Sequence, residues 1–150
     1  MSTANAVANR FLELAENDNS QLTPMQVLKL VYMAHGWMLG LYHRPLIDQR
    51  IEAWRYGPVI PTLYDAMRHF RSSPVTGRLP ANDNILDPSE SDVVEQVYRN
   101  YGHLSGIALS RLTHQSGTPW EQTYRGDFMG DEIPNDVIEA YYAGRAARAA

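Results

Sequence analysis

Apolar residues recur along most of this chain at intervals of three and four, the spacing that places them on one face of an α-helix. The stretch 3–16 shows this repeat and ends at the polar run 17–20, which predicts a first helix. The stretch from Thr23 to about Leu41 is apolar on more than one face, and such a helix is expected at the centre of a fold. The same repeat predicts further helices over residues 88–101, 105–112 and about 135–148.

Three of the predicted helix starts share one residue pattern. In each, a Thr or Asp precedes a proline, and a Glu or Gln follows two residues after that proline. The Thr or Asp side chain accepts a hydrogen bond from a free backbone N–H, and the Glu or Gln reaches back to the capping residue. Proline gives up only a donor that would be unpaired at this position. The pattern occurs at residues 23–26, 87–90 and 118–121.

Two stretches lack the helical repeat. Around residues 44–54, a short alternation bounded by turn residues predicts a small two-stranded element or an extended segment. Residues 71–84 contain prolines, glycine and asparagines and predict a long irregular loop, a type of loop that often carries function. Neither flank of this loop has enough helices to enclose a core alone, so we expect a single domain over residues 1–150. The expected fold class is mainly α, a compact multi-helix domain of about six to seven helices with a minor two-stranded β element.

Composition and charge narrow the function. The chain has 150 residues and no cysteine, which excludes disulfides, thiolate zinc sites and a cysteine nucleophile. A formal net charge of −4 gives no general attraction to phosphate backbones, so we expect no nucleic-acid partner. No apolar run is long enough to span a membrane, and the first residues lack a secretory signal pattern. We therefore expect a cytoplasmic protein with no membrane partner.

Four sequence blocks, taken in order, are similar to a known family. The blocks are residues 28–37, 42–46, 52–61 and 112–120, the last including Leu112-Thr113-His114-Gln115 and Pro119-Trp120. They resemble the Panacea domain of SocA-like antitoxins and of phage-associated GepA-like proteins. Each block is only moderately specific, but their order and spacing extend the resemblance from about Leu22 to Tyr142.

This resemblance implies a fold and a function. It implies an α-helical Panacea-like domain with a minor β element that neutralises a small cognate protein toxin, encoded beside it, by direct binding. For SocA-like members it also implies a role as a proteolytic adaptor that delivers the toxin to the ClpXP protease. We find no phosphate-binding loop, zinc-protease motif or nucleophile elbow in the chain. We therefore expect a protein that is not an enzyme and needs no cofactor.

The predicted partner-binding surface centres on the segment 54–61, which combines rigid aromatic side chains, an arginine and two prolines. Tyrosine, tryptophan and arginine are the residue types that anchor protein interfaces. The residues predicted to bind the partner are Trp54, Arg55, Tyr56, Gly57, Pro58 and Arg71. In the competing interpretation, Trp54 and Tyr56 are core residues and Gly57-Pro58 is a structural turn before a helix at Pro61. Arg55 lies opposite Trp54 in an extended segment, so its guanidinium should reach solvent.

A second hypothesis is a small metal- or histidine-dependent hydrolase. It would use His35 or His114 as the titrating group, and His114 lies one helical turn beyond Ser110. We favour a buried, hydrogen-bonded role for His35, because no histidine or carboxylate lies three or four residues from it. The same structural interpretation is favoured for His114.

An acidic cluster could supply the hydrolase with a metal. Asp127, Asp131 and Glu132 lie close to two glycines, and carboxylates are the ligands that hard cations prefer. Their spacing fits no EF-hand loop, so a solvated acidic loop is the favoured interpretation.

Overall fold

The computed structural model describes residues 1–82, 85–126 and 130–149. Its elements are α1 (Ala4–Asn17), α2 (Pro24–Tyr42), β1 (Glu52–Trp54), β2 (Gly57–Val59), α3 (Pro61–Met67), the 3-10 turn η1 (Arg68–Phe70), α4 (Pro88–Tyr101), α5 (Gly106–Thr113), α6 (Pro119–Thr123), β3 (Asp131–Glu132) and α7 (Asn135–Ala149). The predicted mainly α class with a minor β element is confirmed. None of the described helices combines the length and the apolar character that crossing a membrane would require.

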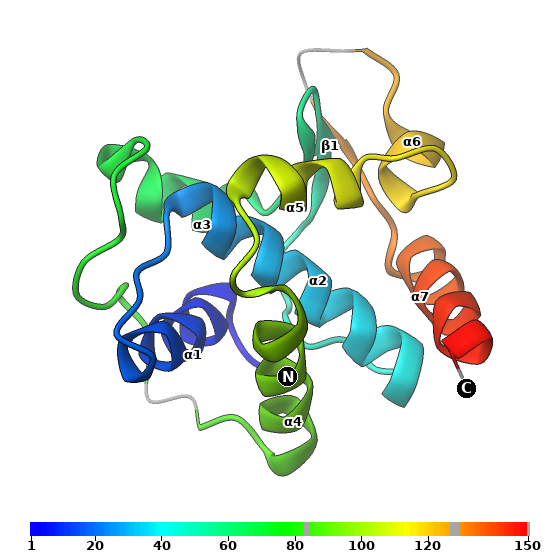
Figure 1. The fold of residues 1–150 in the computed structure, drawn as a ribbon. Helices are drawn as coiled ribbons and strands as arrows, with labels where there is room; N and C mark the ends of the chain where they lie inside the picture. The colour runs from blue at the N-terminus through cyan, green and yellow to red at the C-terminus, as the bar shows by residue number, and fades with distance from the viewer. Residues whose placement is uncertain (83–84, 127–129, 150) are drawn as a thin grey trace.

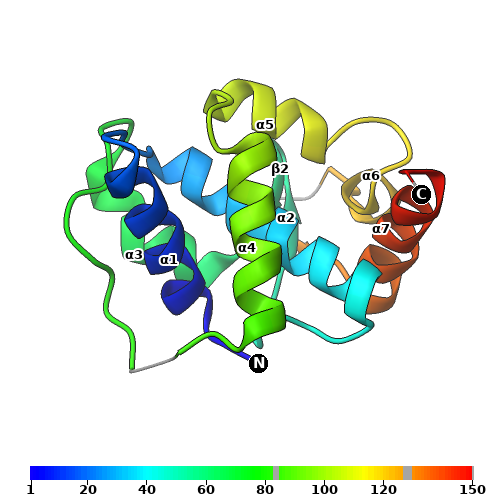
Figure 2. The same ribbon diagram turned by 60° about the horizontal axis from the view of Figure 1, so that its bottom comes forward.

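Helix α2 lies at the centre of the fold, as its apolar sequence predicts. Figures 1 and 2 show it running through the middle of the molecule, and α1, α4, α5 and α7 pack around it. Its buried side chains lie on all sides of the helix and run from Val27 to Leu39. Because this one helix contacts most of the others, its residues position nearly every surface described below.

The predicted helix caps form, with one variation. Thr23 and Asp87 each accept from the third helical N–H, and the Gln or Glu at that position accepts from the capping N–H in return. Thr118 accepts from the N–H of Glu121 in the same way. The Glu121 carboxylate, however, accepts from the Gly117 N–H at 2.8 Å, so the reciprocal bond is shifted by one residue.

The β element is a three-stranded antiparallel sheet with the strand order β2-β1-β3. Ala53 of β1 pairs with Pro58 of β2 on one side and with Asp131 of β3 on the other. The antiparallel pair β1–β2, called the hairpin below, confirms the predicted two-stranded element. The third strand, β3, was not predicted. The upstream part of the predicted segment, residues 44–51, contributes only one isolated bridge, at Ile47.

The predicted long loop is irregular over its described residues, 71–82, but it is attached to the helices. Val75 donates its N–H to the carbonyl of Leu22 at 2.8 Å. Asn9 of α1 makes two hydrogen bonds to the backbone of Leu79, accepting at 2.7 Å and donating at 2.9 Å. Both Val75 and Leu79 are buried, so this stretch of the loop covers part of the core.

Candidate functional site

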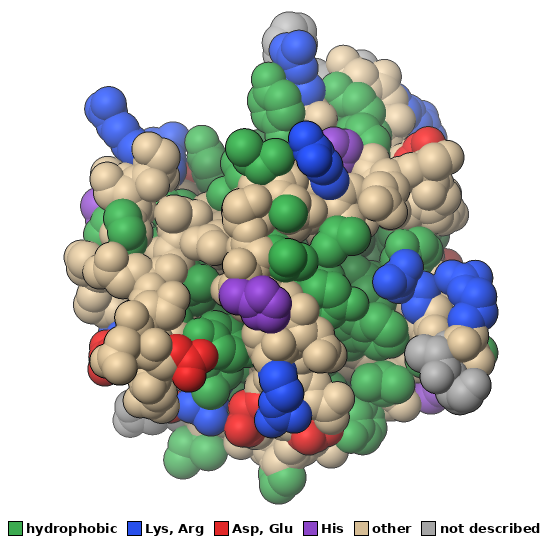
Figure 3. All heavy atoms as spheres, viewed as in Figure 1, with side chains coloured by type: hydrophobic (Ala, Val, Ile, Leu, Met, Phe, Trp, Pro, Cys, Tyr) green, Lys and Arg blue, Asp and Glu red, His purple; other side chains and the backbone are tan. Residues whose placement is uncertain are grey.

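A groove of about 650 Å³ lies between the start of α2, the β1–β2 hairpin and the α3–η1 segment. In Figure 3 the surface is notched between the α3 end of the molecule and the hairpin at the top of the view. The walls of the groove are largely apolar and aromatic, and several of its side chains are unusually exposed for their type: Met25 is 43% exposed, Tyr56 68% and Tyr64 38%.

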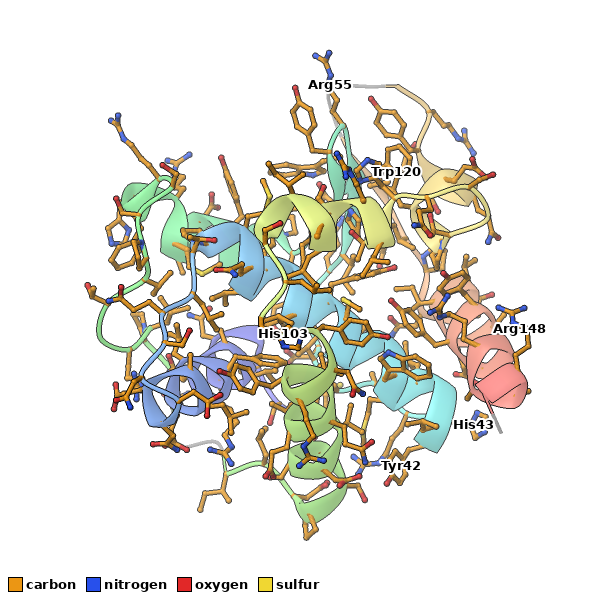
Figure 4. All side chains as sticks on the ribbon, viewed as in Figure 1. Tyr42, His43, Arg55, His103, Trp120 and Arg148 are labelled. Atoms are coloured by element: carbon orange, nitrogen blue, oxygen red, sulfur yellow. The ribbon has the colours of Figure 1, made fainter. Side chains whose placement is uncertain are left out.

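Four of the six residues predicted to bind a partner line this groove, namely Trp54, Arg55, Tyr56 and Arg71. Arg55 is exposed, as the alternation predicts, and Figure 4 shows it reaching away from the body at the tip of the hairpin. Its guanidinium lies 5.5 Å from the centroid of the Tyr56 ring. The competing interpretation, in which Tyr56 is a core residue, is wrong, because Tyr56 is a turn residue at the hairpin tip and most of its side chain is in solvent.

Trp54 is partly a core residue and also lines the groove. Its side chain is partly buried and packs against the core, and its ring meets Tyr64 edge to face with centroids 5.3 Å apart. Its indole N–H donates to the carboxylate of Glu52 at 2.9 Å. The same ring lines the groove, so Trp54 supports the hairpin while forming one of the groove walls.

Gly57 and Pro58 do not line the groove but shape the turn beside it. Both are buried. Gly57 has a φ of +119°, a conformation that side chains rarely adopt, and a Cβ at this position would lie 2.7 Å from Nζ of Lys29. Pro58 lies in β2 opposite Ala53.

The hairpin backbone is held from below by two helices. Nζ of Lys29, on α2, donates to the carbonyl of Pro58 at 2.9 Å and to that of Tyr56 at 3.4 Å. The hydroxyl of Ser110, on α5, donates to the same Tyr56 carbonyl at 2.8 Å. Lys29 was not among the residues predicted to contribute to the site. A lysine within a nearly continuous apolar helix does, however, indicate a buried, hydrogen-bonded amine.

A third attachment comes from α6. The Trp120 indole N–H donates to the carbonyl of Trp54, and Figure 4 shows Trp120 beside the hairpin. Trp120 stacks on Tyr124 with centroids 4.7 Å apart and meets His114 edge to face at 5.3 Å. The exposed tip at Arg55 is therefore carried on a backbone that α2, α5 and α6 fix in place.

Comparison with known proteins identifies the family. The family model described as "Antitoxin SocA-like, Panacea domain" matches residues 27–121. The chain belongs to the SocA-like antitoxin family. It is 30% identical to antitoxin SocA of Caulobacter vibrioides (strain NA1000 / CB15N) over 133 residues, which cover 82% of this chain and 71% of that protein. No solved structure matches the chain.

The family match includes most of the groove of this SocA-like antitoxin. Residues 27–121 contain the whole hairpin, Lys29, Ser110 and Trp120, as well as Arg71. The groove residues outside the matched range come from the first turn of α2 and from the segment after α6. The resemblance inferred from the four sequence blocks is thus confirmed at the level of the family.

Ser110 and His114 lie close enough to interact, but Ser110 also has a second, nearer partner. Ser110 and His114 Nδ1 lie 3.3 Å apart, as their spacing on the helix predicts. The hydroxyl of Ser110, however, also donates to the Tyr56 carbonyl at 2.8 Å, the shorter of its two contacts. His35 is buried and hydrogen-bonded, as favoured above, with Nε2 2.9 Å from the Asn135 side-chain oxygen.

The acidic residues do not form a metal site within the described part of the chain. Asp127 lies outside the described residues. Asp131 and Glu132 form β3, where Glu132 pairs with Arg50 at 3.0 Å and Asp131 lies 3.8 Å from Arg125. Among described residues, no three histidine or carboxylate side chains are grouped so that they could hold a metal ion.

Lys29 is expected to make the stability of the protein depend on pH. Burial lowers the pKa of Lys29 to about 7, whereas the unfolded chain keeps a value near 10.5. Between these two values the unfolded chain binds the extra proton, so stability rises with pH. From pH 7 to pH 9 we expect the wild type to gain about 2 kcal/mol relative to Lys29→Met, as measured by urea unfolding at each pH. Parallel pH profiles for the two proteins would show that the amine does not titrate in this range.

Proposed function

We propose that this SocA-like antitoxin neutralises a small protein toxin encoded beside it by direct binding, and that the toxin docks on the groove under the β1–β2 hairpin. The observation that carries the proposal is the exposed pair Arg55 and Tyr56 on a hairpin whose backbone is hydrogen-bonded to α2 and α5. Family membership supports the antitoxin role, and the groove supports the choice of surface.

The hairpin surface is chosen because its backbone would lose little conformational freedom when a partner binds. An interface side chain on a mobile loop loses backbone freedom when a partner binds, which weakens the complex. Here the Tyr56 carbonyl already accepts from Lys29 and Ser110, and the Trp54 carbonyl accepts from Trp120. Binding would therefore order little beyond the exposed side chains.

Three finer parts belong to the same proposal. The antitoxin acts by binding and not by chemistry of its own, as its membership of an antitoxin family favours. It forms one Panacea-like domain over residues 1–150, as is supported by α1 and α7, which lie outside the matched residues 27–121 and both pack on α2. It works in the cytoplasm, where a chain without cysteine is at no disadvantage and where ClpXP can receive the captured toxin.

The proposal is tested by replacing the exposed tyrosine. We expect Tyr56→Ala to weaken binding of the neighbouring gene's product by about tenfold, because a large aromatic contact is lost. Tyr42→Ala is the matched control. Tyr42 is 43% exposed and is the last residue of α2, whereas the groove lies at the start of that helix (Figure 4). Binding is measured by isothermal titration calorimetry with purified proteins, and growth rescue is measured in cells that express the toxin.

The outcomes separate the parts of the proposal. If the wild type neither binds the neighbouring product nor rescues growth, the antitoxin role fails. If Tyr56→Ala binds as tightly as Tyr42→Ala, the toxin docks elsewhere. Rescue that persists in cells lacking ClpX would indicate that occlusion alone is enough and would end the adaptor part of the proposal.

A further inference from the structure

Positive charge is gathered around the groove, although the whole chain carries a formal charge of −4. Arg55, Arg68 and Arg71 all line it. The described groove residues include no aspartate or glutamate. The local charge is therefore opposite in sign to that of the molecule, which favours an occupant that carries carboxylates.

These three arginines are also available for a partner. Within the described part of the chain, none of them forms an ion pair. Some arginines elsewhere on the surface do pair with carboxylates: Arg44 bonds Asp87 at 3.0 Å, and Arg50 bonds Glu52 at 2.8 Å. The guanidinium groups at the groove are exposed, and no carboxylate among the described residues pairs with them.

The walls between the arginines are apolar. Met25 and Tyr64 are 43% and 38% exposed, although both are large apolar residues, and Leu28 and Met67 continue the surface inward. A ligand that offered only charge would leave this apolar area in water. Aromatic rings and arginines also line the groove and could hold a single-stranded nucleic acid, but the net charge of −4 gives the chain no general attraction to phosphate, so nucleic acid is the weaker candidate.

We propose that the groove binds a segment of the partner protein in which apolar side chains alternate with, or are flanked by, carboxylates. The apolar side chains enter between Met25 and Tyr64, and the carboxylates pair with Arg55, Arg68 and Arg71 at the rim. The inference rests on the proposed function, because it describes the segment by which a toxin would be held.

The chemistry of the groove can be tested without the toxin. The probe is a short fluorescein-labelled peptide of leucine, phenylalanine and glutamate, and its counterpart has lysine at each glutamate position. In fluorescence anisotropy we expect the wild type to bind the glutamate peptide about tenfold or more tightly than the lysine peptide. The double variant R68E/R71E should lose this preference, whereas R99E, a charge reversal at an exposed arginine of α4, should keep it. Circular dichroism melting checks that both variants remain folded.

Each outcome decides the inference. Equal binding of the two peptides, or a preference that survives R68E/R71E, overturns it. A single-stranded oligonucleotide that displaces the glutamate peptide from the wild type overturns it in favour of nucleic acid, and a dimer that only R68E/R71E dissociates overturns it in favour of a second copy. Calorimetry with the neighbouring gene's product is a separate measurement: if that product binds wild type and R68E/R71E equally, the antitoxin role stands and the groove inference falls.

Discussion

Replacing Gly40 with valine is expected to lower the free energy of unfolding by about 3 kcal/mol, because α2 and α7 are in backbone contact at this position. A Cβ on Gly40 would lie 2.7 Å from the backbone carbonyl carbon of Tyr142 and 2.8 Å from the nitrogen of Ala143. Backbone atoms cannot rotate away as a side chain can, so α7 must move off α2 and leave poorly packed space behind it. The better helix propensity of valine over glycine offsets only a few tenths of a kcal/mol.

The matched control is Gly144→Val, on the facing helix. Gly144 also lies within a helix, α7, but a Cβ there would meet no other atom within 4 Å. Its free energy of unfolding should stay within about 0.5 kcal/mol of the wild type. Urea unfolding followed by far-ultraviolet circular dichroism measures both variants. Equal losses for the two would show that the helices do not meet as closely as described.

This close approach shows where sequence patterns stop being informative. The apolar repeat of α2 correctly predicted a central helix, because periodicity is a local property of the chain. It gave no reason to single out Gly36 and Gly40, whose role depends on the ring and backbone of Tyr142, about a hundred residues away. The third strand was missed for the same reason, since Asp131 pairs with Ala53.

Some residues of the candidate site were predicted and others were not. Most of those that were predicted are close together in the sequence, and those that were missed join the site only through folding. The segment 54–56 was singled out because aromatic and arginine residues are adjacent there, and Arg71 is the first residue of the predicted loop. Met25, Tyr64 and Arg68 join them only after α2 and α3 have folded against the hairpin. Gly57 and Pro58 were also predicted to bind the partner. Both are buried in the turn, and only their neighbours at residues 54–56 line the groove.

His35 is the other residue on α2 whose loss should be severe. Its Nδ1 accepts from the N–H groups of both Leu46 and Ile47 at 3.3 Å, and its Nε2 lies 2.9 Å from the Asn135 side-chain oxygen. Because Nδ1 accepts two hydrogen bonds, it carries no proton. The proton of the neutral ring is therefore on Nε2, which donates to the Asn135 side-chain oxygen. The ring thus joins α2 to the segment before β1 and to the start of α7.

We expect His35→Ala to lower the free energy of unfolding by about 4 kcal/mol, through a buried cavity and two backbone N–H groups left without an acceptor. His35→Asn should cost less, because its side-chain oxygen can take the place of Nδ1.

The stability should also depend on pH through His35. Burial lowers the pKa of His35, so below pH 6.5 the unfolded chain binds a proton more readily than the folded chain does. Wild-type stability should therefore fall by up to about 1.4 kcal/mol per pH unit relative to His35→Asn, which has no proton to gain. Urea unfolding at pH 7 and pH 5.5 measures both effects. A histidine that is charged in the folded protein would give the opposite pH trend, and the hydrogen-bond assignment would then be wrong.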